Sequence, residues 1–395
     1  MEKHSVILLL LCLLSVLVSL SSSNGGFAMA ATGTQDGSQW GYVEVRPKAH
    51  MFWWLYRSPN RVEDPSKPWP IILWLQGGPG SSGVGIGNFE EIGPLDTELK
   101  TRNSTWLRKA DLLFVDNPVG TGFSYVGDEK DLVETDEAAA TDLTTLLKEL
   151  FNKNESLQKS PLYIVAESYG GKYAVTLGLS VLKAIQANEL KLKLGGIALG
   201  NTWISPEDFV FSWGPPLKDV SRLDNKGLDQ SNSIAKQIKQ QIKDGNFVNA
   251  KKSWLELENV ITENSNSVDF YKFLLDSEGN GVSMSAMESS RQVVSMKRYS
   301  TYLQSMKSSS SRGGVDLNSF MNRVIRKKLE IIPDNVKWGG QEELVSSALG
   351  GDFMKPRVNE VDELLAKGVN VTIYNGQVRA NHPNSFNDLY RPTQN

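Results

Sequence analysis

Apolar runs alternate with helix-like stretches between residues 69 and 201, and this alternation restricts the possible folds more than any other feature. Residues 69–76 (WPIILWLQ) and 111–118 (DLLFVDNP) are rich in branched and aromatic side chains and are bounded by proline or glycine. Such runs are typical of strands buried on both faces. The pattern continues as a helix at 135–153, a strand at 162–168, a helix at 170–186 and a strand at 192–201. We therefore predict an α/β protein with a mostly parallel central sheet covered by helices on both sides.

Aromatic strands precede this region and a helical region follows it. Residues 40–46 and 49–58 predict two strands joined as a hairpin. Residues 205–345 have helical and polar segments but no comparable buried strand, which favours an inserted cap over a site. Within it, 306–314 (MKSSSSRGG) has the composition of a flexible loop. The predicted organisation is a signal peptide (1–30), a core first part (31–204), a helical cap (205–345), a core second part (346–378) and an irregular tail (379–395).

The first thirty residues are typical of a secretory signal peptide. A charged start is followed by an apolar run from Val6 to Leu20, and small residues near position 30 could be cleaved. An uncleaved anchor is the alternative. The single cysteine, Cys12, lies in this segment, so the mature chain would have no disulfides. Behind such a signal, three N-x-S/T triplets become candidate glycosylation sites: Asn103, Asn154 and Asn370.

Charge and hydropathy exclude two classes of partner. The 395 residues have a net charge of −3, which gives no basic surface for nucleic acid. After residue 30, no apolar stretch is long enough to span a bilayer. The chain is long enough to bury one large core. Its oligomeric state is left open by the sequence.

Ser168 stands where the predicted strand 162–168 turns into the predicted helix 170–186. The pentapeptide A-E-S-Y-G nearly matches G-x-S-x-G, with Ala166 in place of the first glycine. Small residues are needed at such a corner because the serine has strained dihedral angles and the helix passes close to the strand. The corner exposes the hydroxyl at the positive end of a helix, which suits a nucleophile. The alternative is a serine that merely caps the helix.

The glycine-rich segment 75–83 (LQGGPGSSG) follows the earlier buried strand. A phosphate-binding loop is one interpretation of its glycines, but no G-K-[ST] follows. A loop after a strand next to the nucleophile strand can instead supply a backbone N–H to an oxyanion. Gly78 and Tyr169 are the candidate donors.

Several motifs in this order resemble the serine carboxypeptidase family, especially its retinoid-inducible and serine carboxypeptidase-like branches, which also have glutamine before the glycine pair. They are residues 74–82 (WLQGGPGSS), 91–94 (EIGP), 115–125 (VDNPVGTGFSY), 166–173 (AESYGGKY) and 374–377 (YNGQ). The resemblance implies an α/β-hydrolase fold with a helical cap and removal of C-terminal residues from peptides. It also implies secretion or delivery to a vacuole or lysosome, with no cofactor and no metal.

By the same resemblance, Ser168 matches the nucleophile and Gly78 and Tyr169 match the oxyanion donors. Gln76, Glu91 and Glu167 match the groups that bind the carboxylate of the substrate. Two glutamates brought together repel, so one keeps its proton at mildly acidic pH and can donate a hydrogen bond to an anion. Without the resemblance, Glu91 would be read as an ordinary surface glutamate.

The resemblance fails where a base for Ser168 is expected. A serine hydroxyl needs a histidine, oriented by a carboxylate, to accept its proton. In the family an aspartate directly follows the YNGQ strand and the histidine follows a further helix and strand, whereas here position 379 is arginine. His382, with Asp388 to orient it, is a conceivable substitute. We expect a chain ending this way to lack its last helix and strand and to be inactive or impaired; acyl transfer and non-catalytic binding of peptide carboxylates are the alternative functions.

Overall fold

A computed structural model describes residues 32–35, 37–270, 273 and 316–376. The predicted signal peptide, the predicted loop at 306–314 and the irregular tail lie outside the described residues. The strands are β1 (Thr32–Gln35), β2 (Ser38–Arg46), β3 (Ala49–Tyr56), β4 (Ile71–Leu75), β5 (Asp111–Val115), β6 (Tyr125–Val126), β7 (Pro161–Glu167), β8 (Lys193–Gly200) and β9 (Val371–Tyr374).

The helices of the described residues fall into long α-helices and shorter turns. They are η1 (Gly83–Ile92), η2 (Trp106–Arg108), η3 (Glu129–Asp131), α2 (Asp136–Asn152), α3 (Glu155–Gln158), α4 (Gly170–Gln186), α5 (Pro206–Asp219), α6 (Asn225–Lys243), α7 (Phe247–Asn264), α9 (Leu317–Ser319), η5 (Phe320–Ile325), α10 (Arg326–Leu329), α11 (Glu342–Ala348), η6 (Leu349–Gly351) and α12 (Val358–Ala366).

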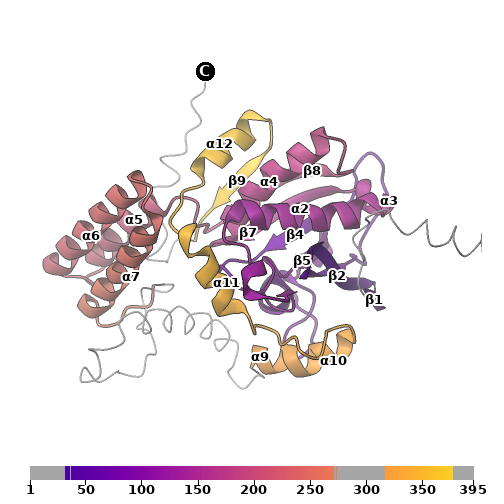
Figure 1. Ribbon diagram of the computed structural model, residues 1–395, viewed down its shortest axis with the longest axis horizontal. Coiled ribbons are helices and arrows are strands. Elements are labelled where there is room, and N and C mark those ends of the chain that lie inside the picture. Colours follow the sequence, from indigo (N-terminus) through magenta and orange to yellow (C-terminus); the bar gives the residue numbers. More distant parts are fainter. Residues whose placement is uncertain (1–31, 36, 271–272, 274–315, 377–395) are drawn as a thin grey trace, which may run out of the picture.

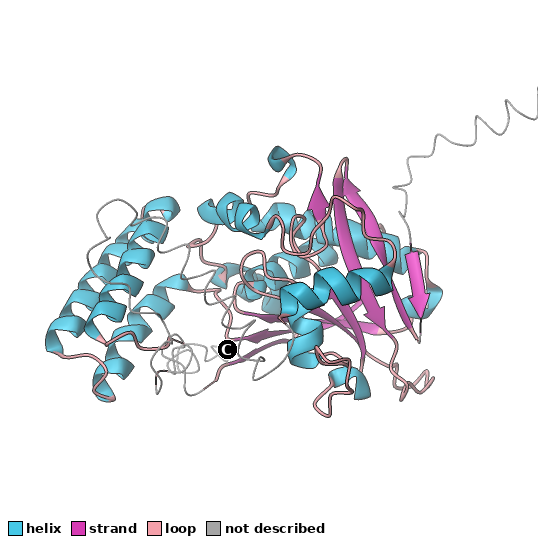
Figure 2. Ribbon diagram, turned by 90° about the horizontal axis from the view of Figure 1, so that it is seen from below, coloured by secondary structure: helices cyan, strands magenta, loops and turns pink. Residues whose placement is uncertain are grey.

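The strands form one mixed sheet in the order β1-β2-β3-β5-β4-β7-β8-β9, with β6 paired to β3. The pairs β4–β5, β4–β7, β7–β8 and β8–β9 are parallel, whereas β1, β2, β3 and β6 pair antiparallel. The mostly parallel sheet and the aromatic hairpin predicted from the sequence are thereby confirmed. Figure 2 shows helices on either side of the strands.

Both faces of the sheet are buried. Successive side chains of a strand point to opposite faces, so neighbouring residues of one strand pack into different hydrophobic clusters. In β3, Met51 and Trp53 pack into one hydrophobic cluster together with α2 and α4. The alternate residues Phe52 and Trp54 pack into a second cluster with η1 and with residues 317–338. Continuous apolar strands are therefore required in the middle of the sheet.

The region predicted as a cap divides into two parts in Figure 1. Helices α5, α6 and α7 lie together at one end of the molecule, beyond the carboxyl ends of β7 and β8. The later part, from α9 to α10, returns to the sheet: Phe320 packs on Phe89 with ring centroids 5.0 Å apart, and the Trp40 indole donates a hydrogen bond to the carbonyl of Leu329 (3.1 Å). The 205–345 boundaries stay a prediction; residues from 317 to 338 pack into the second hydrophobic cluster, and residues of α5, α6 and α7 pack into the first.

The helix η1 is not predicted by the sequence analysis. Its sequence GVGIGNFEEI has three glycines, which disfavour a helix in isolation. The glycines are needed by tertiary packing instead: a Cβ at Gly85 would lie 2.4 Å from the Trp338 ring, and one at Gly87 would lie 2.4 Å from Trp74. Ser82 caps the helix by accepting a hydrogen bond from the N–H of Gly85 (2.8 Å).

Candidate active site

Ser168 stands at the junction of β7 and α4, as the sequence predicts. Its backbone has φ of 55°, a left-handed conformation that non-glycine residues rarely adopt, and its side chain is exposed. Hydrogen bonds hold this conformation from both sides: the Ser168 N–H donates to the Gly200 carbonyl (3.2 Å), and its carbonyl accepts from the N–H of Trp203 (2.9 Å) and of Gly171 (3.1 Å). The hydroxyl is therefore presented by a fixed backbone.

Glycines around the corner allow the close approach that this geometry needs. A Cβ on Gly77 would lie 2.7 Å from the Ser168 Cβ, and one on Gly170 would lie 2.3 Å from the Leu75 carbonyl oxygen. On the other side, a Cβ on Gly171 would lie 2.3 Å from the Thr202 Cβ. No other residue type fits these positions without displacing the backbone around Ser168.

The two candidate oxyanion donors reach the same edge of the sheet. Strands β4 and β7 are parallel neighbours with Leu75 opposite Ala166, which places the loop beginning at Gln76 beside Glu167 and Ser168. Gly78 in this loop has φ of +115°, where only glycine is comfortable, and a cis peptide bond joins it to Pro79. Tyr169 is the N-cap residue of α4, so its N–H lies at the helix start, where backbone donors have no intrahelical partner.

Hydrogen bonds to Asp116 fix the end of the glycine-rich loop. Its Oδ1 accepts hydrogen bonds from the Ser82 hydroxyl (2.5 Å) and the Val84 N–H (3.1 Å), and its Oδ2 accepts from the Phe123 N–H (2.8 Å). Complete burial raises the pKa of Asp116 to about 7. The Trp338 indole also donates to the Ser82 oxygen (3.1 Å). The sequence analysis quoted this aspartate within a motif but assigned it no role.

Gln76, Glu91 and Glu167 come together beside Ser168. The Trp74 indole donates to the Gln76 Oε1 (2.6 Å), and the Gln76 amide donates to the Glu91 Oε1 (3.2 Å). Burial and, next, the charge of Glu167 raise the pKa of Glu91 well above its ordinary value. Glu91 therefore holds its proton to a higher pH than an ordinary glutamate does, and it is not an isolated surface glutamate.

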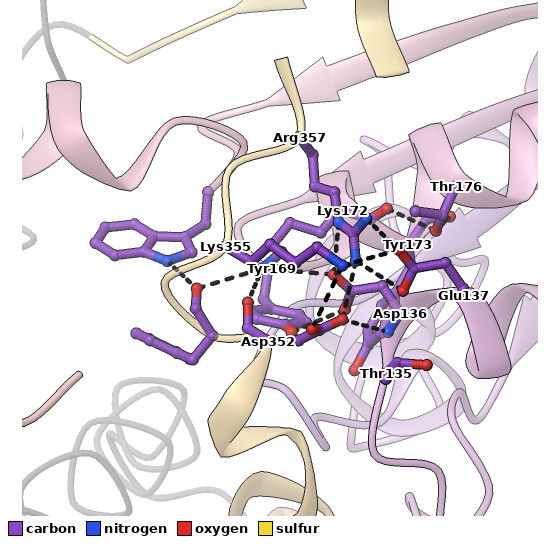
Figure 3. Close-up of polar contacts among 12 residues, drawn as sticks. Thr135, Asp136, Glu137, Tyr169, Lys172, Tyr173, Thr176, Asp352, Lys355 and Arg357 are labelled. Carbon is purple, nitrogen blue, oxygen red and sulfur yellow. Dashed lines mark hydrogen bonds and ion pairs between the residues drawn. The ribbon is translucent and has the colours of Figure 1, made fainter. Parts of the chain in front are cut away.

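A buried ionic network lies behind Tyr169 (Figure 3). The Tyr169 hydroxyl donates to the Asp136 Oδ1 (2.8 Å), at the first residue of α2, and its ring stacks on Phe353 with centroids 5.8 Å apart. The opposite oxygen of Asp136 binds the guanidinium of Arg357 (2.9 Å), which also binds Asp352 (2.9 Å). The residue whose N–H is a candidate oxyanion donor is thus anchored through its side chain. The sequence analysis missed this network because its members come from three separate segments.

Lys172 is part of the buried ionic network and is not placed to act as a base for Ser168. It follows Ser168 by one helical turn, and burial lowers its pKa to about 8, which would suit a base. Its Nζ, however, is fully buried, donates to the Phe353 carbonyl (3.3 Å) and lies 3.4 Å from the Asp136 carboxylate. These contacts direct the amine into the interior while the Ser168 side chain faces outward.

His50 is the histidine that falls among the described residues, and it lies far from Ser168. Its ring stacks on Tyr125 with centroids 4.7 Å apart, and burial lowers its pKa. It belongs to β3, which is separated from β7 by β5 and β4. Three interstrand spacings put the two strands about 14 Å apart. Arg379, His382 and Asp388 lie outside the described residues, together with His4.

Comparison with known proteins identifies the family. The serine carboxypeptidase family model matches residues 30–384. The chain belongs to the serine carboxypeptidase family. It is 60% identical over 383 residues to serine carboxypeptidase-like 51 of Arabidopsis thaliana, which covers 96% of this chain and 82% of that protein. It is 44% identical over 379 residues to the retinoid-inducible serine carboxypeptidase of Mus musculus, with 95% and 81% covered.

A solved structure supports the fold. A prohormone-processing carboxypeptidase from Saccharomyces cerevisiae superposes with a TM-score of 0.68 at 19% identity, covering 88% of this chain and 75% of that chain. The α/β-hydrolase fold expected from the resemblance is confirmed, as is membership of a family of peptidases that act on peptide substrates. The comparisons do not favour the acyl-transfer alternative. None of the helices in the described part of this serine carboxypeptidase homologue is long and apolar enough to cross a bilayer.

Proposed function

We propose that this chain binds the C-terminal residue of a peptide and that Ser168 attacks the preceding carbonyl to form an acyl-enzyme. Gly78 and Tyr169 supply the N–H groups for the oxyanion, each lowering the activation barrier by on the order of 3 kcal/mol. Gln76, Glu91 and Glu167 bind the terminal carboxylate. No cofactor and no metal take part.

One observation carries this proposal: two glutamates, Glu91 and Glu167, lie directly beside an exposed serine at a strained corner. Glu167 precedes Ser168 in the chain, so the anion site is one residue from the nucleophile. That short separation suits an enzyme that removes one terminal residue. The raised pKa of Glu91 means that the pair retains a proton in mildly acidic solution and repels a carboxylate once that proton leaves. We therefore propose an acidic working range.

We also propose that none of the described residues (32–35, 37–270, 273 and 316–376) acts as the base for Ser168. His50 is held on β3 away from the nucleophile, and Lys172 is bound in the interior. His382 stands in a segment without hydrophobic periodicity, and an imidazole must be held to about 0.5 Å to act as a base. In an unrelated protease, removal of the base costs on the order of 10⁶-fold in turnover.

The test separates binding from turnover. Release of the terminal amino acid from an N-blocked dipeptide is measured at acidic pH for the parent chain and for Ser168→Ala, alongside labelling by a fluorophosphonate. Release that Ser168→Ala abolishes, with labelling that is also lost in Ser168→Ala, is expected. Release unaffected by Ser168→Ala would refute the nucleophile.

The proposed route is the secretory pathway, ending outside the cell or in a vacuole or lysosome. Asn103 and Asn370 are exposed and are proposed to carry glycans. Asn154 is half-buried and its Oδ1 accepts from the Ser156 N–H (3.0 Å) to cap α3, which leaves its Nδ2 for attachment. Treatment of the secreted protein with an endoglycosidase should lower its mass at all three asparagines; an unchanged mass would contradict this proposal.

A further inference from the structure

Glu167, Gly200 and Tyr374 form one row across three neighbouring strands. Glu167 is the last residue of β7 and is paired with Gly200 of β8, which in turn is paired with Tyr374 of β9. Side chains at paired positions of a parallel sheet point to the same face. Tyr374 therefore projects on the same side as Glu167, with a residue that has no side chain between them.

The Tyr374 ring fills the space that Gly200 leaves. A Cβ on Gly200 would lie 2.4 Å from both the Tyr374 Cζ and its hydroxyl oxygen. The hydroxyl thus lies over β8, about one interstrand spacing of 4.8 Å from the β7 backbone that carries Glu167. Asn201 fixes the strand end: its N–H donates to the Tyr374 carbonyl (2.9 Å), and its Oδ1 accepts from the Gly376 N–H (2.7 Å).

The charges around the phenol agree with this placement. Burial raises the pKa of Tyr374, and the carboxyl groups of Glu167 and Glu91 raise it further. Glu90 adds to the negative potential at Glu91. The phenol consequently keeps its O–H throughout the acidic and neutral range and is available as a neutral donor.

A carboxylate ligand needs such a donor. It presents about four acceptor positions, whereas one N–H of the Gln76 amide is already directed to Glu91. The shared proton of the glutamate pair is a further donor, but it is lost as the pH rises. A phenol supplies a hydrogen bond that does not depend on pH in this range.

We propose that Tyr374 is a third recognition residue of the carboxylate site, and that its phenolic O–H donates to the terminal carboxylate of a bound peptide. This inference rests on the proposed function of Gln76, Glu91 and Glu167. It adds a residue from β9, which is separated from β7 by β8, to a site otherwise made by residues near β4, η1 and β7.

Equilibrium binding tests the inference without requiring turnover. In the Ser168→Ala background, dissociation constants are measured for an N-blocked dipeptide and for its C-terminal amide, with and without Tyr374→Phe. Tyr374→Phe is expected to weaken binding of the acid about tenfold and to leave binding of the amide unchanged. At a second, higher pH, chosen so that the glutamate proton has been lost, the variant should no longer prefer the acid.

Tyr163→Phe is a matched control. Tyr163 is on β7, four residues before Glu167, and its ring likewise covers a glycine of β8: its Cζ would lie 2.7 Å from a Cβ added to Gly195. Tyr163 and Glu167 are about 13 Å apart along the strand. This variant should bind acid and amide like the parent.

The outcomes distinguish a failure of the inference about Tyr374 from a failure of the proposed carboxylate site. If the parent binds acid and amide equally, the carboxylate site itself is wrong. If the parent prefers the acid and Tyr374→Phe preserves that preference at both pH values, the role of Tyr374 alone is refuted. Equal weakening of acid and amide by Tyr374→Phe, with an unchanged unfolding midpoint, would also refute it, because the lost contact would then not involve the carboxylate.

Discussion

At the scale of single residues, the corner at Ser168 requires a residue without a Cβ at position 77. Gly77 and Ser168 are neighbours across β4 and β7, and a Cβ on Gly77 would come within 2.7 Å of the Ser168 Cβ and 3.1 Å of its hydroxyl oxygen. A real Cβ is not found that close to another carbon, so either the corner or the loop must move. The loop cannot move freely, because Asp116 binds Ser82 and Val84 just beyond it.

Gly77→Ala should therefore lower the free energy of unfolding by about 1–3 kcal/mol. The matched control is Gly351→Ala, since an added Cβ at Gly351 has no neighbour within 4 Å and its φ is not positive. Ser168→Gly removes the atom that Gly77→Ala would strike, and glycine also suits the φ of 55°. In a double-mutant cycle followed by urea unfolding, Ser168→Gly should recover about 1 kcal/mol or more of the loss. Strict additivity would show that the predicted contact is not the cause.

At the scale of elements, Arg357 joins the start of α2, the segment before α12 and, through Asp136, the corner at Tyr169. Its guanidinium binds Glu137 in two hydrogen bonds, of 2.5 and 2.9 Å, and also binds Asp136, Asp352 and Glu360. The hydrogen bond to Arg357 lowers the pKa of Glu137 to about 2. The side chain of Arg357 is 1% exposed, so its removal would leave buried carboxylates without their cation.

Arg357→Met should consequently destabilise the protein by about 3–5 kcal/mol. Lys355→Met is the control, because Lys355 binds Glu137 (3.1 Å) from a side chain that is 35% exposed; its loss should cost less than about 1 kcal/mol. Chemical unfolding measures both. Comparable losses in the two variants would contradict the view that burial, and not the number of ion pairs, makes Arg357 important.

At the scale of the whole molecule, the sequence predicts what is periodic and local, and misses what depends on register. Strands such as Ile71–Leu75 and helices such as Gly170–Gln186 were predictable, because continuous apolar runs and helical spacing of leucines are visible in the chain. The strained serine corner was also predictable, from its small residues. Arg357 and Tyr374 were not, because a single charged or aromatic residue does not reveal a partner far away in the sequence, such as Asp136 for Arg357.

The titrating groups also combine at this scale to favour acidic conditions. Asp116 has an ordinary pKa of 3.8 and a folded-state pKa of about 7, so the folded chain binds more protons than the unfolded chain between these values. Its contribution to stability is fully present below about pH 4 and is lost as the pH rises to about 7, by about 4 kcal/mol at most. Glu91 acts in the same direction. Glu137 acts in the opposite direction at lower pH, where its stabilisation is lost as the pH falls from 4.5 to about 2.

The free energy of unfolding should therefore pass through a maximum between about pH 4 and pH 6 and decline toward neutrality. Urea unfolding at a series of pH values measures this curve. Asp116→Asn should flatten the decline between acidic and neutral pH, although its absolute stability will be lower because an amide nitrogen would face the N–H of Phe123 or Val84. A parent curve that rises from pH 5 to pH 7, or an Asp116→Asn curve as steep as the parent's, would show that the buried carboxyl groups do not set the pH range. A maximum in the acidic range would mean that the fold is most stable under the conditions in which Glu91 holds its proton.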